Sequence, residues 1–404
     1  MTRARVDLSP RRPPRILPLI VAAQFAGTSL WFVGNAALDG LDAPWAAMDG
    51  AVGWLTSSVQ LGFIVGTLSY AFTGVADRFR GHWVFFVSAS AAALSNLAAL
   101  AYVDVFAWFL CSRVATGFFL AGVYPVGMKL AASWYERGLG SAIGLLVGAL
   151  VLGTASPYLL KIFAVDALTL VLVSSALALA GGLAILRWVP EGPHTRLAAD
   201  QSWRAAWSPF AAPGFRAAAL GYFGHMWELY AFWAFAPFAV ALVAPGASPE
   251  TAALWAFAII GGGSVACAVG GHASTRRGSA VVAGVALAGS GLCAIASPMV
   301  FLHAPAPVAL AFLVVWGMLV VADSPQFSAL AARSAPPERV GTGLTLMNAI
   351  GFAVTIPSIE LLATIEHSVP SHMLFLPLAC GPALGAAALV RLLRDDPTRP
   401  GRAG

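Results

Sequence analysis

Three ionisable side chains lie deep inside long apolar stretches of the sequence, where charge is rare. Arg113, Glu228 and Asp323 interrupt these stretches in a chain of 404 residues that is 59% hydrophobic and only 10% charged. His225 precedes Glu228 by three residues, so a helix would place both on one face. Buried carboxylates and imidazoles are groups that take up and release protons. A guanidinium at such depth needs an anionic partner, carbonyl groups or water.

Each of these residues could also have a purely structural role. Arg113 would then bond to carbonyls of a neighbouring helix, and His225 and Glu228 would satisfy one another. Asp323 stands beside Ser-Pro-Gln, and because proline kinks a helix, we expect its carboxylate to face a cavity. Glu360 lies near the end of an apolar stretch, and we expect it to be solvated. No His-Glu-x-x-His pattern or metal-ligand spacing occurs, so the sequence predicts no metal, no cofactor and no enzyme activity.

Uncharged polar and aromatic residues in the same stretches are candidates for recognising a small molecule. Inside a membrane, such groups hydrogen-bond either to a neighbouring helix or to a solute. Aromatic residues crowd positions 222–235, and rings all around one helix mostly indicate packing. The candidates are Gln24, Gln60, Tyr124, Trp227, Tyr230 and Asn348.

The elements that must position these residues are apolar segments long enough to cross a membrane. A spanning helix needs about 20 residues, so the chain has room for about twelve spans. We expect an all-α membrane protein and exclude an outer-membrane barrel, whose strands alternate in polarity and run about 10 residues. The predicted spans cover 16–38, 52–74, 84–102, 105–128, 141–161, 167–187, 215–242, 251–271, 279–300, 307–330, 342–364 and 372–392.

Positive charge is confined to one side of these predicted spans. Nearly all of the 23 lysines and arginines fall in the two tails and in every second loop. The positive-inside rule then predicts that both termini are cytoplasmic, in a multi-pass protein of the inner (plasma) membrane. The net charge of +5 is explained by this topology and gives no reason to expect nucleic-acid binding.

The two halves of the chain repeat one another. Gly117 and Pro125 in the fourth predicted span match Gly317 and Pro325 in the tenth, at an offset of 200 residues. An offset of about half the chain, with both halves starting on the same side, predicts parallel repeats. We therefore expect two parallel six-helix bundles, residues 1–188 and 214–404, joined by a central cytoplasmic loop, residues 189–213.

This organisation and several motifs resemble the major facilitator superfamily. The family's loop motif between spans two and three is similar to Asp77-Arg78-Phe-Arg-Gly81, and its second copy to the stretch that ends in Arg276-Arg277-Gly278. Arg113-Val-Ala-Thr-Gly117 is similar to the family's span-four motif. The resemblance implies that spans one, four, seven and ten line a central path. It also implies gating loops that contain Asp77, Arg78, Gly81, Arg276, Gly278, Glu136 and Arg137.

The sequence thus predicts a secondary active transporter that works by alternating access. The proton gradient would drive it through Glu228 with His225, or through Asp323, and Arg113 favours a small polar or anionic solute. An alternative is a proton-driven exporter of amphipathic compounds, favoured by the aromatic residues at 222–235. A membrane sensor that transports nothing is a further alternative. The expected partners are a small-molecule substrate, protons and bilayer lipid, and we expect a monomer.

Overall fold

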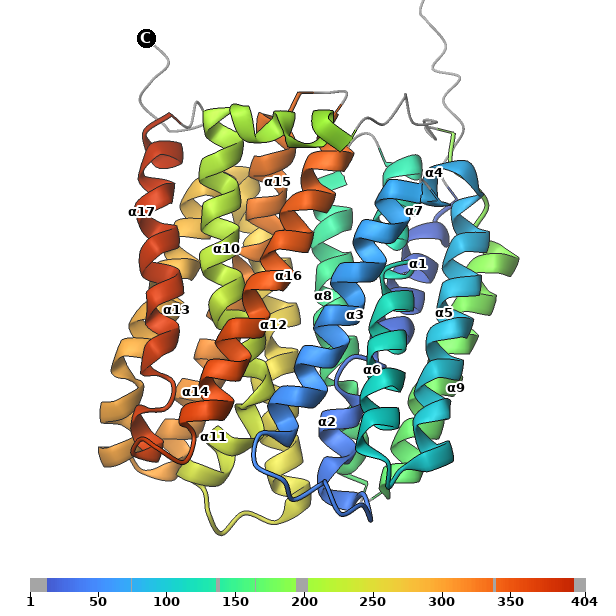
Figure 1. The fold of residues 1–404 in the computed structure, drawn as a ribbon. Coiled ribbons are helices and arrows are strands. Elements are labelled where there is room, and N and C mark those ends of the chain that lie inside the picture. The colour runs from blue at the N-terminus through green and yellow to red at the C-terminus, as the bar shows by residue number, and fades with distance from the viewer. Residues whose placement is uncertain are drawn as a thin grey trace, which may run out of the picture.

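The computed structural model describes residues 13–73, 75–135, 139–163, 165–193, 203–336 and 339–395. Within these ranges every regular element is a helix. Ten helical stretches are long and apolar enough to cross a membrane, and two bent helix pairs bring the number of spans to twelve when each pair counts as one. The helices run side by side, as Figure 1 shows. The predicted all-α membrane fold is confirmed.

Short breaks divide several of these spans. The first half contains α1 (Ile16–Thr28), α2 (Val33–Ala37), α3 (Ala51–Thr73), α4 (Val75–Arg78), α5 (Gly81–Ala98), α6 (Phe106–Leu120), α7 (Tyr124–Trp134), α8 (Leu139–Lys161) and α9 (Ala167–Trp188). A 3-10 stretch, Trp203–Ala211, precedes the second half. That half contains α10 (Pro213–Ala234), α11 (Ala236–Val243), α12 (Pro249–Arg277), α13 (Ser279–His303), α14 (Ala306–Ala322), α15 (Ser324–Ser334), α16 (Val340–Ile365) and α17 (Cys380–Asp395).

The first and fourth spans of each half are the broken ones. Helices α1 and α2 meet at 49°, and α10 and α11 meet at 58°. Helices α6 and α7 together form one span, as do α14 and α15, and each of these spans has a short interruption of the helix within it. Pro125, Pro237 and Pro325 stand in the first turn of the second helix in three of these pairs, where a missing N–H costs nothing. In the first pair, the Thr28 hydroxyl donates to the Gln24 carbonyl at 2.8 Å, a contact that bends helices. Breaks at matching places support the predicted parallel repeats.

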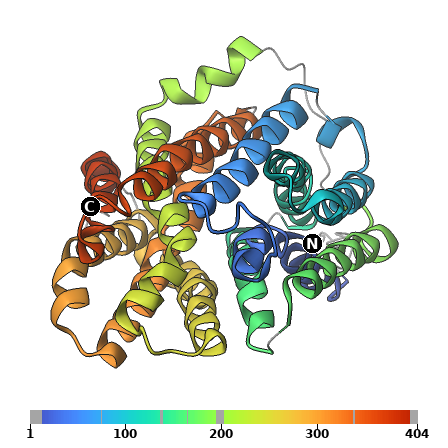
Figure 2. The same ribbon diagram turned by 60° about the horizontal axis from the view of Figure 1, so that its bottom comes forward.

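The helices form two bundles that meet along two helix pairs. Between the bundles α3 packs against α16 and α8 against α12, and Figure 2 shows α3 beside α16. Small residues permit this approach, as is usual between membrane helices. A Cβ at Gly148 of α8 would lie 3.3 Å from the Ser264 carbonyl oxygen of α12. Inside the first bundle, a Cβ at Gly62 or Gly117 would collide with a carbonyl of the facing helix, so α3 and α6 touch through their backbones.

The start of α1 and the end of α17 lie on the same face of the molecule, at the top of Figure 1. Exposed arginines such as Arg80, Arg187 and Arg277 flank helix ends on this terminal face. The arrangement agrees with the charge pattern, and we expect the terminal face to be cytoplasmic. The boundaries 1–188, 189–213 and 214–404 stay a prediction.

Candidate functional site

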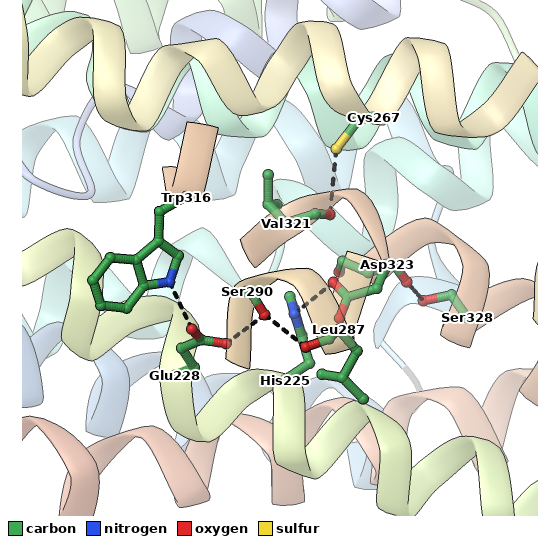
Figure 3. A network of polar contacts seen from close by, with 10 residues as sticks. His225, Glu228, Cys267, Leu287, Ser290, Trp316, Val321, Asp323 and Ser328 are labelled. Atoms are coloured by element: carbon green, nitrogen blue, oxygen red, sulfur yellow. Dashed lines mark hydrogen bonds and ion pairs between the residues drawn. The ribbon is translucent and has the colours of Figure 1, made fainter. Parts of the chain in front are cut away.

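Glu228 lies at the centre of a buried polar network in the second bundle. Its side chain is fully buried on α10. The Trp316 indole Nε1 of α14 donates to Glu228 Oε1 at 2.7 Å, and the Ser290 hydroxyl of α13 donates to Glu228 Oε2 at 2.7 Å. Figure 3 shows these three side chains converging from three helices. Both donors are neutral, so they solvate the carboxyl without countering its charge.

His225 and Asp323 form a second buried pair next to this network. His225 Nδ1 lies 2.8 Å from Asp323 Oδ1, and both side chains are 0% exposed. Asp323 occupies the break between α14 and α15, and its backbone carbonyl accepts from the N–H groups of Gln326 and Phe327 at 2.9 Å each. Among the described residues, His225 Nε2 and Asp323 Oδ2 have no hydrogen-bond partner.

The two groups of contacts share one helix face. His225 and Glu228 are three residues apart on α10, and both point toward the broken tenth span (Figure 3). An isolated charge is very costly in such surroundings, whereas a pair of opposite charges or a protonated carboxyl is tolerated. The site therefore holds two carboxyl groups and one imidazole, all fully buried. Such a group of residues can carry protons, and the predicted candidates His225, Glu228 and Asp323 are the ones that the structure brings together.

The Arg113 guanidinium hydrogen-bonds mainly to backbone carbonyls of the first bundle. Its Nη2 donates to the carbonyls of Leu30 and Trp31 at 2.8 Å each, and its Nη1 donates to Asn96 Oδ1 at 2.7 Å. The two carbonyls belong to the break between α1 and α2, where a helix end leaves acceptors without partners. Gly34 makes room, since a Cβ there would lie 3.1 Å from Arg113 Nε. These contacts agree with a structural role for Arg113, which holds the broken first span in place.

The uncharged candidates lie in different environments. Gln24 is fully buried between α1 and α7, and both of its amide atoms lack a described partner. Trp227 donates to the Pro377 carbonyl at 3.2 Å and therefore faces the 3-10 turn Leu376–Ala379 that leads into α17. Tyr124 begins α7 at the break of the fourth span, and Asn348 lies half-buried on α16. The structure does not gather these residues into one cluster.

An aromatic cluster connects the two bundles. Trp31 and Phe63 come from the first bundle, and Tyr230 and Phe352 come from α10 and α16 of the second. Their ring centroids lie 5.0 Å apart for Trp31–Phe63, 5.7 Å for Trp31–Tyr230 and 4.4 Å for Phe63–Phe352. Tyr230 also contacts the Trp233 ring at 5.3 Å. Among the described residues, the indole N–H groups of Trp31 and Trp233 have no acceptor.

Gln60 belongs to the same interface between the bundles. It is fully buried on α3, and neither of its amide atoms has a described partner. Ser57 and Phe63, on the two sides of Gln60, both contact α16, so helical geometry directs Gln60 toward the second bundle as well. Within the described part of the chain, Gln60 and the indoles of Trp31 and Trp233 are thus neutral polar groups without partners, and the two indoles pack on the aromatic cluster.

Several residues of the site carry no distinguishing signal in the sequence. Trp31, Phe63 and Phe352 resemble any of the other aromatic residues in the chain, and Ser290 and Trp316 belong to no motif. For Trp31 one signal exists, because tryptophan usually lies at the membrane–water interface, whereas Trp31 lies inside an apolar segment.

The predicted gating residues are only partly described. Gly278 lies between α12 and α13 with φ 82°, a conformation that favours glycine, which accounts for the glycine of the second-half motif. Gly81 begins α5 and is buried, with Leu130 close by, and Arg78 and Arg276 are exposed. The side chain of Asp77 and all of Glu136 and Arg137 lie outside the described residues.

Contacts between the bundles also occur on the face opposite the termini. The Ser57 hydroxyl of α3 donates to Glu360 Oε1 of α16 at 2.6 Å. One turn further out, a Cβ at Gly53 would lie 2.9 Å from that of Ala363. Glu360 is half-buried near the outer end of its span, where we expected a solvated acid, and its carboxylate also accepts a hydrogen bond across the interface of the bundles.

Two parallel six-helix bundles with buried ionisable groups are features of secondary membrane transporters. The model of the Major Facilitator Superfamily matches residues 16–358, and the chain belongs to this family. The family is one of transporters and not of enzymes. A search of curated protein sequences gives no match.

Solved structures of similar fold cover nearly the whole chain. The human organic anion transporter TETRAN has a TM-score of 0.72 at 15% identity, with 94% of this chain and 100% of that one covered. The nucleoside transporter NupG has a TM-score of 0.69 at 15% identity, covering 93% and 99%. The E. coli fucose:proton symporter FucP has a TM-score of 0.67 at 15% identity, covering 93% and 98%. At this identity the likeness shows the fold.

Proposed function

We propose that the protein is a proton-coupled secondary active transporter of a small polar solute in the inner membrane, with both termini cytoplasmic. The observation that supports this best is the group of buried titratable residues, with His225 2.8 Å from Asp323 and Glu228 on the same face of α10. In this proposal, protons bind and leave these residues as the two bundles rock about the site. One structural neighbour is named a fucose:proton symporter, which is consistent with such coupling.

The break at Asp323 gives a protonation event a mechanical consequence. A proton that binds to the His225–Asp323 pair changes the net charge of the pair, and with it the electrostatic interaction between α10 and the hinge of the tenth span. The matching hinge of the fourth span has Val123 at the corresponding position. Proton coupling is therefore proposed for the second bundle only.

Among the buried polar groups that a solute could meet between the bundles, neutral ones predominate. Arg113 already donates to three oxygens, which leaves it poorly placed to bind an anion. Gln60 and the indoles of Trp31 and Trp233 are neutral, lack described partners and border aromatic rings. A solute with hydroxyl or amide groups on one side and an apolar face on the other suits this combination, because it satisfies the buried donors and stacks on the rings.

Transport into proteoliposomes tests the proposal. Vesicles with an internal pH-sensitive dye would be exposed to neutral polyols, nucleosides and small carboxylates, with and without an imposed pH gradient. We expect a neutral solute to move protons with it, and Glu228→Gln and Asp323→Asn to abolish the proton signal. Asp104→Asn, which changes an exposed acid, is the matched control. Solute flux that ignores the gradient would refute proton coupling, and movement of carboxylates alone would refute the neutral solute.

A proton-driven exporter of amphipathic compounds is the second candidate. The aromatic cluster of Trp31, Phe63, Tyr230 and Phe352 favours it, since a large ring surface binds many apolar molecules without requiring particular hydrogen bonds. The same vesicles distinguish the two candidates. An exporter would transport structurally unrelated dyes with similar affinities, and Gln60→Ala would leave those affinities unchanged. A transporter of a polar solute would be selective and would lose affinity on that substitution.

A further inference from the structure

A hollow of about 590 Å³ lies on the terminal face of the first bundle, whereas the polar network lies in the second bundle. It is bordered by the start of α1, the start of α5 and the end of α9, through Arg15, Arg80 and Arg187. His82 and Trp188 also line it. Three arginines from three helices therefore converge on one space.

The charges of these arginines are not neutralised within the described part of the protein. Among the described residues, Arg15, Arg80 and Arg187 have no ion-pair or hydrogen-bond partner, and all three are exposed. Glu191 lies beside the hollow, with its Oε1 3.4 Å from His82 Nδ1, so one carboxylate stands against three guanidinium groups. An excess of positive charge therefore remains in the hollow.

Two helix starts add to this positive potential. Arg15 is the residue before α1 and Arg80 the residue before α5, and neither helix start has a side-chain cap or an acidic residue in its first turn. The first N–H groups of a helix need acceptors, and the helix dipole is positive at this end. Anions bind at such places, and here the arginines reinforce them.

Apolar residues place the hollow at the level of lipid headgroups. Trp188 is 49% exposed at its edge, and Trp83 is 50% exposed on α5. Exposed tryptophans are typical of the membrane–water interface. Leu183, one turn before Arg187 on α9, is also exposed, so an apolar surface runs from the hollow toward the membrane core.

We propose that this hollow binds the phosphate headgroup of an anionic phospholipid from the adjacent leaflet. Guanidinium groups bind phosphate through paired, charge-assisted hydrogen bonds, which fits Arg80 and Arg187 on the adjacent helices α5 and α9. Trp188 and Leu183 contact the glycerol and acyl chains. A lipid bound here links the start of the broken first span to α5 and α9, and this site is separate from that for the transported solute.

Lipid binding to the purified, delipidated full-length protein tests the proposal. Native mass spectrometry would count retained lipids after addition of phosphatidylglycerol or phosphatidylcholine, and thermal unfolding would follow the same titrations. We expect phosphatidylglycerol to bind at least about tenfold more tightly than phosphatidylcholine. Arg80→Gln with Arg187→Gln should remove most of this preference. The matched control, Arg277→Gln with Arg333→Gln, removes the same charge from exposed positions of the same face and should keep it.

Two further measurements distinguish a lipid site from a soluble-anion site and from a general surface attraction. Inorganic phosphate and glycerol phosphate should protect the protein far less than the lipid, and equal protection would indicate a site for a soluble anion instead. Equal losses in both double variants would overturn the proposal in favour of a general attraction of the surface for anionic lipid. If the double glutamine variant does not fold, Arg80→Lys with Arg187→Lys replaces it. That variant keeps the charge but loses the paired hydrogen bonds, and an unchanged lipid preference in it would also count against the site.

Discussion

His225 Nδ1 lies 2.8 Å from Asp323 Oδ1, and this pair connects an unbroken stretch of α10 to the hinge of the tenth span. Both side chains are fully buried, so the contact forms without water as a competitor. Removing one partner of a buried ion pair leaves the other charge uncompensated. The resulting loss of stability is larger than the net contribution of the intact pair. In the proposed mechanism, the pair is therefore the place where a proton alters both charge and helix packing.

A double-mutant cycle measures this coupling. Asp323→Asn and His225→Asn should each destabilise the protein, and the double variant should lose less than the sum of the two because neither uncompensated group remains. We expect an interaction energy of about 1–3 kcal/mol from unfolding in detergent. Strictly additive effects would contradict a functional pair. Asp104→Asn, at an exposed position, provides the reference for removing a negative charge.

The substitution Glu228→Gln tests the role of Glu228 in proton coupling while leaving the fold intact. The glutamine keeps the shape of the side chain and an oxygen that accepts from the Trp316 indole, so we expect stability within about 1 kcal/mol of the natural protein. Glutamine cannot bind or release a proton, so uptake driven by a pH gradient should fall at least about tenfold. Exchange of labelled for unlabelled solute should persist. Loss of both activities in a stable variant would instead place Glu228 in solute binding.

Arg113→Gln tests the structural role of the buried arginine. The substitution leaves the Leu30 and Trp31 carbonyls without their charged donor, and we expect a loss of about 2–4 kcal/mol in unfolding free energy. Asn96→Ala removes one contact of Arg113 and also the hydrogen bond that Asn96 Nδ2 donates to Ser175 Oγ at 2.9 Å, so it should cost about 1–3 kcal/mol. The KM for solute should change less than about threefold in any variant that folds. A large rise in KM with normal stability would indicate instead that Arg113 binds the substrate.

The twelve spans and their duplication were predictable because both depend on local properties of the sequence. Apolar length marks each span, and the match of Gly117 and Pro125 to Gly317 and Pro325 marks the repeat. The break in the first span was not predictable. It contains no proline, and it is held by Arg113, which is distant in the sequence and bonds to backbone carbonyls that have no sequence signature.

The sequence predicted which residues form the candidate site but not which of them contact one another. Burial of charge singled out Glu228 and Asp323, and helical spacing joined His225 to Glu228. In the structure, His225 instead lies against Asp323, and Glu228 accepts hydrogen bonds from Trp316 and Ser290. Which partner a buried side chain meets depends on the angles between helices, and the sequence does not encode these angles locally.

Asp166 gives the protein an acid-sensitive helix cap outside the membrane spans. Its carboxylate accepts from the Thr169 N–H at 2.7 Å at the start of α9, and hydrogen bonding to Thr169 lowers the pKa of Asp166 below its ordinary value. The stabilisation is therefore present above about pH 4, the unfolded value, and is lost as pH falls through the lowered pKa. The Tm difference between the natural protein and Asp166→Ala should stay constant near neutrality and shrink in acid. A difference that grows in acid would contradict this cap, and Asp104→Ala is the control.

The Ser57–Glu360 hydrogen bond should hold the bundles together on the face opposite the termini. It joins α3 to α16 at 2.6 Å beside the close approach of Gly53 and Ala363. Ser57→Ala removes the donor and leaves the carboxylate half-buried, so opening of this face should become easier by about 1 kcal/mol, or about fivefold in population. Gln60→Cys introduces a fully buried thiol whose labelling by a membrane-impermeant maleimide reports such opening, with the exposed Cys111 and Cys380 replaced by serine. The labelling rate should rise about fivefold when Ser57→Ala is added. An unchanged rate would mean that packing of Gly53 against Ala363, and not the hydrogen bond, keeps this face closed.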